Sequence, residues 1–165
     1  MIELTPQRLL ELKAMRFALK AHGTQKYGNH QYSYHLGQVV ESVKHLMVGD
    51  PLLSTYIAIA WLHDTLEDTE TTFKELHDEF GLAIAAAVFA LTKREGLEYT
   101  DYLVACCENS LARNVKICDT LCNLNESFKT LNQKGMNKYP KQLTILMAGA
   151  WAGQLVLKEI LNDQE

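Results

Sequence analysis

The densest group of chemically competent side chains in the sequence is the segment HDTLED, residues 63–68, which follows a long apolar run. If one helix continues through this segment, His63 and Glu67 lie one turn apart, as do Asp64 and Asp68, so that four polar groups crowd together. Burying carboxylates beside an apolar run is costly unless a cation or hydrogen-bond donors compensate for their charge. A bound metal ion is one such compensation. The alternative is a solvated helix end on which acidic residues cluster by chance.

Helix signals dominate the elements around this segment and strand signals are nearly absent, so the sequence predicts an all-α fold. The predicted helices run from Pro6 to about Gly23, over Leu36–Met47, Leu52–Leu62, Phe73–Gly81, Leu82–Leu91, Tyr99–Cys107, Leu111–Phe128 and Tyr139–Leu161. The third of them has almost no polar face, which predicts a central position in the core. Residues 24–31 are expected to form a polar loop, and residues 129–138 a longer one that could be mobile beside a site.

Length and composition limit the class of protein. A chain of 165 residues with 47% hydrophobic and 22% charged residues fits one soluble globular domain covering residues 1–165. A net charge of −4 gives no overall attraction for nucleic acid or for an anionic membrane, so any anionic substrate needs a local basic patch. Because neither a leader peptide nor a membrane span is evident, the expected location is cytoplasmic. A homo-oligomer is left open.

The four cysteines do not form the pairs typical of zinc sites. None of them belongs to a CxxC motif, and two lie four residues apart on a predicted helix, a spacing that suits small core side chains. We therefore expect reduced thiols rather than disulfides or thiolate metal ligands at all four positions: Cys106, Cys107, Cys118 and Cys122.

Two further segments connect the HDTLED cluster to a known family. His35 ends the segment YSYH, and Asp119 and Asn123 lie one helical turn apart in VKICDTLCNL. Together with AxxAHxxQ at residues 18–25, LHDTLEDT at residues 62–69 and the Phe80-Gly81 pair, these motifs resemble the hydrolase domain of RelA/SpoT enzymes and its stand-alone relatives, including the metazoan SpoT homologue. The resemblance covers about residues 14–125 and implies a single HD-domain helical bundle.

The resemblance also implies a metal site and a catalytic pair. The implied ligands of a divalent metal ion are His35, His63, Asp64 and Asp119. Glu67 and Asp68 would be the acid/base pair that orients and deprotonates the attacking water. Two imidazoles and two carboxylates suit Mn²⁺, Fe²⁺, Co²⁺ or Zn²⁺ better than Mg²⁺ or Ca²⁺, which prefer oxygen ligands. Manganese, the usual ion in the relatives, is the expected one.

Five residues are expected to bind substrate on the same grounds: Lys26, Lys93, Arg94, Asn123 and Tyr139. Asn123 would contact the sugar or phosphate region of a nucleotide, and satisfying nearby backbone groups is its alternative role. Lys93 and Arg94 could meet phosphates, although an ordinary interaction with a helix C-terminus explains them almost as well.

Two positions depart from the pattern of the relatives. Lys26 replaces an arginine that stacks on the base in alarmone hydrolases, and lysine lacks the planar stacking surface. Gly135 stands where the relatives carry a second arginine, one turn before the tyrosine matched by Tyr139, and Lys134 and Lys138 are the candidate substitutes. The expected recognition of the base is weakened by both changes.

The function that the resemblance implies is hydrolysis of a phosphorylated nucleotide, most specifically removal of the 3′-pyrophosphate from (p)ppGpp or a related alarmone such as (p)ppApp. The altered basic loop leaves room for other substrates, including NADPH or a nucleoside monophosphate. A second class of function is a regulatory module that binds a nucleotide without turnover. The intact HDxxED segment favours the enzyme, because a pure binding module has no need of Glu67 and Asp68.

Overall fold

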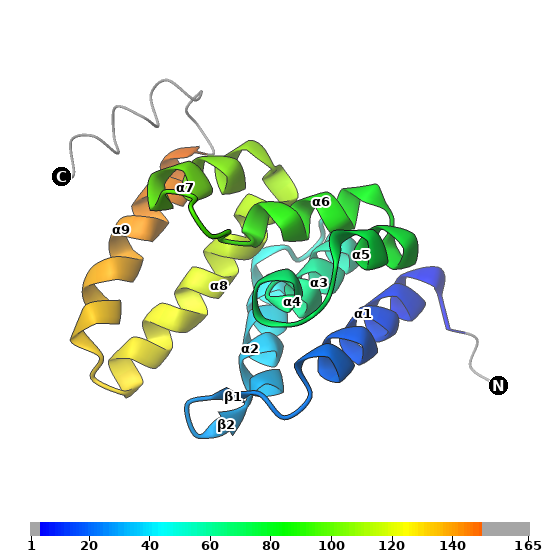
Figure 1. Cartoon of the computed structure of the whole chain (residues 1–165), viewed down its shortest axis with the longest axis horizontal. Helices are drawn as coiled ribbons and strands as arrows, with labels where there is room; N and C mark the ends of the chain where they lie inside the picture. Colours follow the sequence, from blue (N-terminus) through cyan, green and yellow to red (C-terminus); the bar gives the residue numbers. More distant parts are fainter. Residues whose placement is uncertain (1–3, 150–165) are drawn as a thin grey trace.

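The computed structural model describes residues 4–149, and helices make up most of that range (Figure 1). The helices are α1 (Pro6–His22), α2 (Tyr32–Leu46), α3 (Leu53–Leu62), α4 (Thr65–Asp68), α5 (Phe73–Phe80), α6 (Leu82–Leu91), α7 (Tyr99–Glu108), α8 (Ser110–Lys129) and α9 (Gln133–Gly149). The all-α prediction is confirmed. Within the described range, the helices all fall short of the combined length and apolar character that crossing a bilayer requires.

Helix α3 lies at the centre of the fold, as its sequence predicts. Every residue from Tyr56 to Ala60 is buried, and so is Leu62. The helix packs against α1, α2, α6 and α8, so apolar neighbours surround it on several sides (Figure 1). A helix without a polar face is stable in water only when it is enclosed in this way. The core therefore forms around the element whose C-terminal end carries the HDTLED segment.

Local signals set the ends of several helices where the sequence places them. Thr5 caps α1 by accepting a hydrogen bond from the Arg8 N–H at 3.2 Å, and Pro6 occupies the first turn. Thr72 and Glu75 form a reciprocal capping box at the start of α5. Gly81, with φ of +82°, ends α5 and leads directly into α6. These contacts involve neighbours in the chain, which explains why they are predictable.

The loop after α1 contains a small hairpin that the sequence did not indicate. Strands β1 (Lys26–Tyr27) and β2 (His30–Gln31) pair antiparallel, and Gly28 enters the turn between them with φ of +57°. Both strands contact α2 (Figure 1). The hairpin therefore holds Tyr27 close to the first turn of α2.

The predicted polar loop over residues 129–138 is wrong, because helix α9 already begins at Gln133. Asn132 starts the helix: its side chain accepts a hydrogen bond from the Gly135 N–H at 3.1 Å. Leu131, with φ of +54°, makes the tight turn between α8 and α9, which then lie side by side (Figure 1). The polar composition of the first turns of α9 concealed the helix. The predicted end at Leu161 lies outside the described residues.

Candidate metal centre and active site

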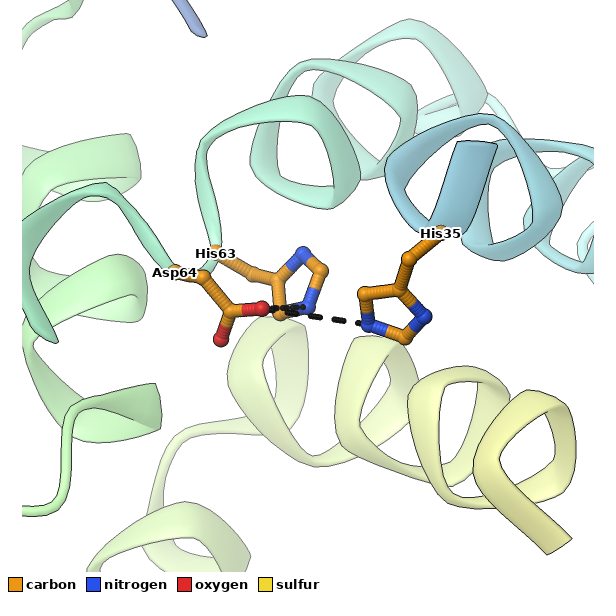
Figure 2. Close-up of side chains that lie close together, drawn as sticks. All are labelled: His35, His63 and Asp64. Atoms are coloured by element: carbon orange, nitrogen blue, oxygen red, sulfur yellow. Dashed lines mark ion pairs between the residues drawn. The ribbon is translucent and has the colours of Figure 1, made fainter. Parts of the chain in front are cut away.

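Four side chains from three parts of the fold converge in the interior. His35 comes from the first turn of α2, His63 and Asp64 from the turn that follows α3, and Asp119 from the middle of α8 (Figure 2 shows the first three). His63 Nε2 lies 2.9 Å from Asp64 Oδ2, and His35 Nε2 lies 3.1 Å from Asp119 Oδ1. The distances from His35 Nε2 to Asp64 Oδ2 and from His63 Nε2 to Asp119 Oδ1 are both 3.8 Å. Ligand atoms of His35, His63 and Asp64 lie within 4.8 Å of one another.

The arrangement around His63 fits a metal ion. Its Nδ1 lies 2.8 Å from the carbonyl oxygen of Ala60, which can only accept a hydrogen bond, so Nδ1 carries the proton. In the neutral ring, Nε2 then presents a lone pair toward Asp64 Oδ2 at 2.9 Å, an atom that also only accepts, so this buried Nε2 has no hydrogen-bond donor. A lone pair that faces a carboxylate oxygen is repelled unless a cation lies between them. Fixing the tautomer of a histidine through its other nitrogen is a common feature of metal ligands.

Charge within the cluster shifts the protonation of its members. Burial alone would lower the pKa of His63, but the carboxylates of Asp64 and Asp119 raise it to about 9. Burial opposes ionisation of Asp64, yet His63 lowers the pKa of this carboxyl to about 2. The pKa of Asp119 is lowered well below its usual range, mainly by Lys116, against the effect of burial. Without metal, a proton on His63 therefore compensates the two carboxylates.

We expect this proton to make the stability of the metal-free protein depend on pH. The folded pKa of His63, about 9, exceeds the ordinary value of 6.5, so its contribution is fully present below pH 6.5 and is lost as the pH rises toward 9. The free energy of unfolding should fall across this interval by an amount on the order of a few kcal/mol. Thermal melts of protein treated with chelator, at several pH values, measure the effect.

Manganese should reverse this trend, because metal binding requires deprotonated ligands and strengthens as the pH rises. The exposed His45 supplies a matched control. His45→Gln should keep the decline in melting temperature, whereas His63→Gln should remove it. An equal decline in both variants would show that His63 does not hold the proton.

Two tyrosines that the sequence analysis did not single out form hydrogen bonds that orient members of the cluster. Tyr32 donates a hydrogen bond to Asp64 Oδ2 at 2.7 Å. Tyr27 donates to Asn123 Oδ1 at 2.8 Å, and Asn123 Nδ2 donates to Asp119 Oδ1 at 2.6 Å. The ring of Tyr27 also stacks on His35, with the ring centroids 4.6 Å apart. The hairpin thus fixes the orientation of side chains from α2 and α8.

Glu67 and Asp68 are consecutive residues of the short helix α4, so their side chains point about 100° apart and meet different surroundings. Helix α3 ends at Leu62, and α4 begins only at Thr65. Glu67 Oε2 accepts a hydrogen bond from the Lys93 N–H at 2.7 Å and lines a cavity beside the metal cluster. Asp68 Oδ2 instead accepts one from Gln25 Nε2 at 3.0 Å, and Asp68 lines a separate hollow next to α1. The two carboxylates are therefore not equivalent.

His22 orients Gln25, the residue that donates a hydrogen bond to Asp68. Its side chain is buried, and its Nδ1 donates to Gln25 Oε1 at 2.8 Å. Its ring also stacks on Tyr32 at 4.5 Å. Three further histidines, His30, His45 and His77, are exposed and lie outside the cluster.

The cavity beside the histidine–aspartate cluster has a volume of about 130 Å³, and three lysines line it. Its lining consists of Asp64, Glu67, Lys93, Tyr99, Tyr102, Lys116, Asp119, Asn123, Lys138, Tyr139 and Gln142. Three lysines lie in this lining beside the carboxylates of Asp64, Glu67 and Asp119, so a cation bound by the carboxylates would make the cavity the local basic patch that an anionic substrate requires. The cavity is therefore suited to phosphate groups.

Lys116 is the cavity residue whose importance the sequence analysis missed. Its Nζ lies 2.8 Å from Asp119 Oδ2 and 5.5 Å from the centroid of the Tyr102 ring. Asp119 raises the pKa of Lys116 well above its usual value, against the effect of burial, so the ammonium group stays charged. A lysine within an apolar helical pattern, three residues before a predicted metal ligand, was the available signal.

The predicted substrate residues divide into two groups. Lys93, Asn123 and Tyr139 line the cavity. Lys26 is exposed on β1, and the Arg94 guanidinium lies over the Phe89 ring at 4.5 Å from its centroid; neither lines the cavity.

The missing arginine at Gly135 has a steric reason. A Cβ atom there would lie 2.1 Å from Ser127 Oγ, because α9 packs closely against α8. Of the two lysines considered as substitutes for this arginine, Lys138 lines the cavity and Lys134 does not. All four cysteines are free thiols, as expected, and three of them are buried.

No family model matches the chain. The chain is 33% identical over 170 residues to the guanosine-3′,5′-bis(diphosphate) 3′-pyrophosphohydrolase of Aquifex aeolicus, a match that covers 97% of this chain and 24% of that protein. It is 30% identical over 125 residues to guanosine-3′,5′-bis(diphosphate) 3′-pyrophosphohydrolase MESH1 of Danio rerio, covering 70% of this chain and 67% of that protein.

A solved structure shares the fold. It is described as that of a metazoan orthologue of SpoT that hydrolyses ppGpp, and it aligns with a TM-score of 0.71 at 20% identity, covering 99% of this chain and 98% of its own. A likeness at this level of identity supports the fold alone.

The helical fold is that of the solved structure, and the two histidines and two aspartates that converge have the residue types of an HD site. The chain belongs to the RelA/SpoT-like hydrolase family, as its match to the Danio rerio protein shows. Membership of this family implies a divalent metal ion. The chain spans about a quarter of the length of the Aquifex aeolicus relative and 18% of the Brucella ovis relative, a GTP pyrophosphokinase.

Proposed function

We propose that this protein is a metal-dependent phosphohydrolase that removes the 3′-diphosphate of (p)ppGpp or of a close analogue such as (p)ppApp. The observation that carries the proposal is the cavity in which Glu67 and three lysines adjoin the cluster of two histidines and two aspartates. The names of the relatives from Aquifex aeolicus and Danio rerio support the same reaction. The proposal includes a cytoplasmic location and a small nucleotide as the partner.

The proposed metal ligands are His35, His63, Asp64 and Asp119, and the proposed ion is Mn²⁺. The mixed nitrogen and oxygen donors and the unpartnered Nε2 of His63 support this assignment. When bound, the ion would polarise a phosphoryl oxygen and lower the pKa of a water molecule.

Glu67 is the proposed base that takes the proton from the attacking water. Burial raises the pKa of Glu67, although the hydrogen bond from the Lys93 N–H opposes this, and a carboxylate closer to neutrality is the stronger base. Water adds its hydroxyl to the phosphorus, the bond from phosphorus to the 3′ oxygen breaks, and that oxygen receives a proton. Asp68 is proposed to assist through its contact with Gln25, which ties the segment to the hairpin loop.

The lysines of the cavity are proposed to hold the diphosphate. Lys116 is fixed by Asp119, while Lys93 and Lys138 lie 5.8 and 5.4 Å from the centroid of the Tyr99 ring. Burial and the positive charge of Lys116 lower the pKa of Lys138, which shows how closely the positive groups are gathered. Phosphate oxygens would relieve this repulsion between like charges and stabilise charge that develops in the transition state.

A panel of nucleotides tests the proposal. The purified protein is incubated with ppGpp, ppApp, NADPH or nucleoside monophosphates, with Mn²⁺, Zn²⁺, Mg²⁺ or chelator, and pyrophosphate and phosphate are measured separately. We expect pyrophosphate from ppGpp or ppApp in the presence of Mn²⁺ and none with chelator. Release of orthophosphate from NADPH or a monophosphate would move the protein to another HD activity. Nucleotide binding without turnover on any substrate would favour a regulatory module.

A further inference from the structure

A second hollow adjoins the catalytic cavity on the side of the hairpin. It has a volume of about 400 Å³ and its lining includes Tyr27, Asn29, Asn123, Glu126, Asn132 and Tyr139. Asn123 and Tyr139 also line the lysine-rich cavity, so the two spaces share a wall. A nucleotide whose phosphates occupy the cavity therefore has the hollow available for its nucleoside.

Glu126 presents an unused acceptor in this hollow. It lies on α8, three residues after Asn123, and its Oε2 is buried without a hydrogen-bond partner. Lys129 Nζ forms an ion pair with it at 3.6 Å, just beyond hydrogen-bond distance, and the side chains of Lys129 and Glu126 are 50% and 20% exposed. A buried acceptor without a partner is unfavourable and is readily explained when a ligand supplies the donor.

The shape of a carboxylate distinguishes between purines. Guanine offers two parallel donors on one edge, the N1–H and the 2-amino group, which match the two oxygens of a carboxylate. Adenine offers an amino group beside N1, whose lone pair would face the carboxylate oxygen and be repelled. A site built to accept hydrogen bonds from its ligand discriminates strongly against an analogue that lacks the donors.

We propose that Glu126 is the specificity-determining residue that reads the base and selects guanine over adenine. The inference rests on the proposed function, because it places the phosphates of the same substrate in the adjoining cavity. Tyr27 and Tyr139 provide aromatic walls for a planar base. Asn123 lies between the two spaces and is held by Tyr27 and by its own bond to Asp119, so the nucleoside side and the metal side are connected through one residue.

The experiment compares guanine and adenine in two independent assays. The first measures kcat/KM for ppGpp and ppApp with Mn²⁺, and the second measures binding of GDP and ADP by calorimetry without turnover. The wild type should prefer guanine in both assays. Glu126→Gln keeps the size of the side chain but loses the charge and one acceptor, so the preference should fall about 10- to 100-fold, mainly through KM and Kd.

Glu41→Gln is the control for the loss of one negative charge, because Glu41 is exposed, pairs with a lysine as Glu126 does, and does not line the hollow. An unchanged preference in Glu126→Gln would overturn the inference. So would a Lys129→Met variant with the same loss, which would assign Glu126 to the ion pair, or a wild type that binds GDP no better than ADP. If the wild type hydrolyses neither alarmone, the proposed function fails, and the ratio of GDP to ADP binding still decides the role of Glu126.

Discussion

The variant Asp64→Asn is expected to abolish pyrophosphate release, with a loss in kcat/KM of at least about 1,000-fold, because a metal ion contributes several kcal/mol to catalysis. Asp64 Oδ2 lies 2.9 Å from His63 Nε2 and 3.8 Å from His35 Nε2, so its charge is central to the proposed metal site. Asparagine keeps the shape and an oxygen that can accept the Tyr32 hydrogen bond. The expected loss is therefore one of metal binding rather than of folding.

Three measurements separate these effects. Metal content shows whether Asp64→Asn still binds the ion, a thermal melt shows whether it folds, and the pyrophosphate assay gives kcat/KM. Asp78→Asn on α5 is the matched control, since Asp78 is paired with the exposed Lys74 away from the cluster and should have no effect on turnover. Full activity in Asp64→Asn, or in wild type stripped of metal, would reject the mechanism.

The variant Glu67→Gln is expected to lower kcat by about 100- to 10,000-fold, the usual contribution of a general acid/base group. Metal content and KM should change little, because glutamine can still accept the Lys93 N–H through Oε1 while it cannot take a proton from water. Steady-state kinetics with ppGpp and Mn²⁺ measure this separation of kcat from KM.

Two neighbouring acidic residues make this prediction specific. Glu70→Gln changes an exposed residue of the same segment and should leave kcat unaltered. Asp68→Asn should cause a smaller loss than Glu67→Gln, because Asp68 contacts Gln25 and lines a hollow outside the catalytic cavity. A larger loss in Asp68→Asn would reassign proton transfer to that carboxylate.

Much of the fold was predictable because its signals are local. The apolar residues of α3 leave no solvent-facing side, and the Thr72–Glu75 capping box and Gly81 mark helix ends through contacts between near neighbours in the chain. Helix α9 was not found in full, because the polar residues at its start resemble a loop and the cap at Asn132 depends on the turn made by Leu131. The hairpin was missed for a similar reason, since each strand has only two residues.

By itself, the sequence determined the helical class, the central place of α3, and the residue types that motif resemblance assigns to a metal site: His35, His63, Asp64 and Asp119. Only the tertiary structure decided that Glu67 faces the cavity while Asp68 faces Gln25, because the two consecutive residues point to different sides of α4 and the packing around α4 sets what each side meets.

Tertiary packing likewise brought Lys116 and Lys138 to the same cavity and left Gly135 no space for a side chain against Ser127. Periodicity and motifs report which residues share one helix face, whereas a site built from several elements depends on how those helices pack. That packing is set by the combined shape of many distant side chains, which no local pattern contains.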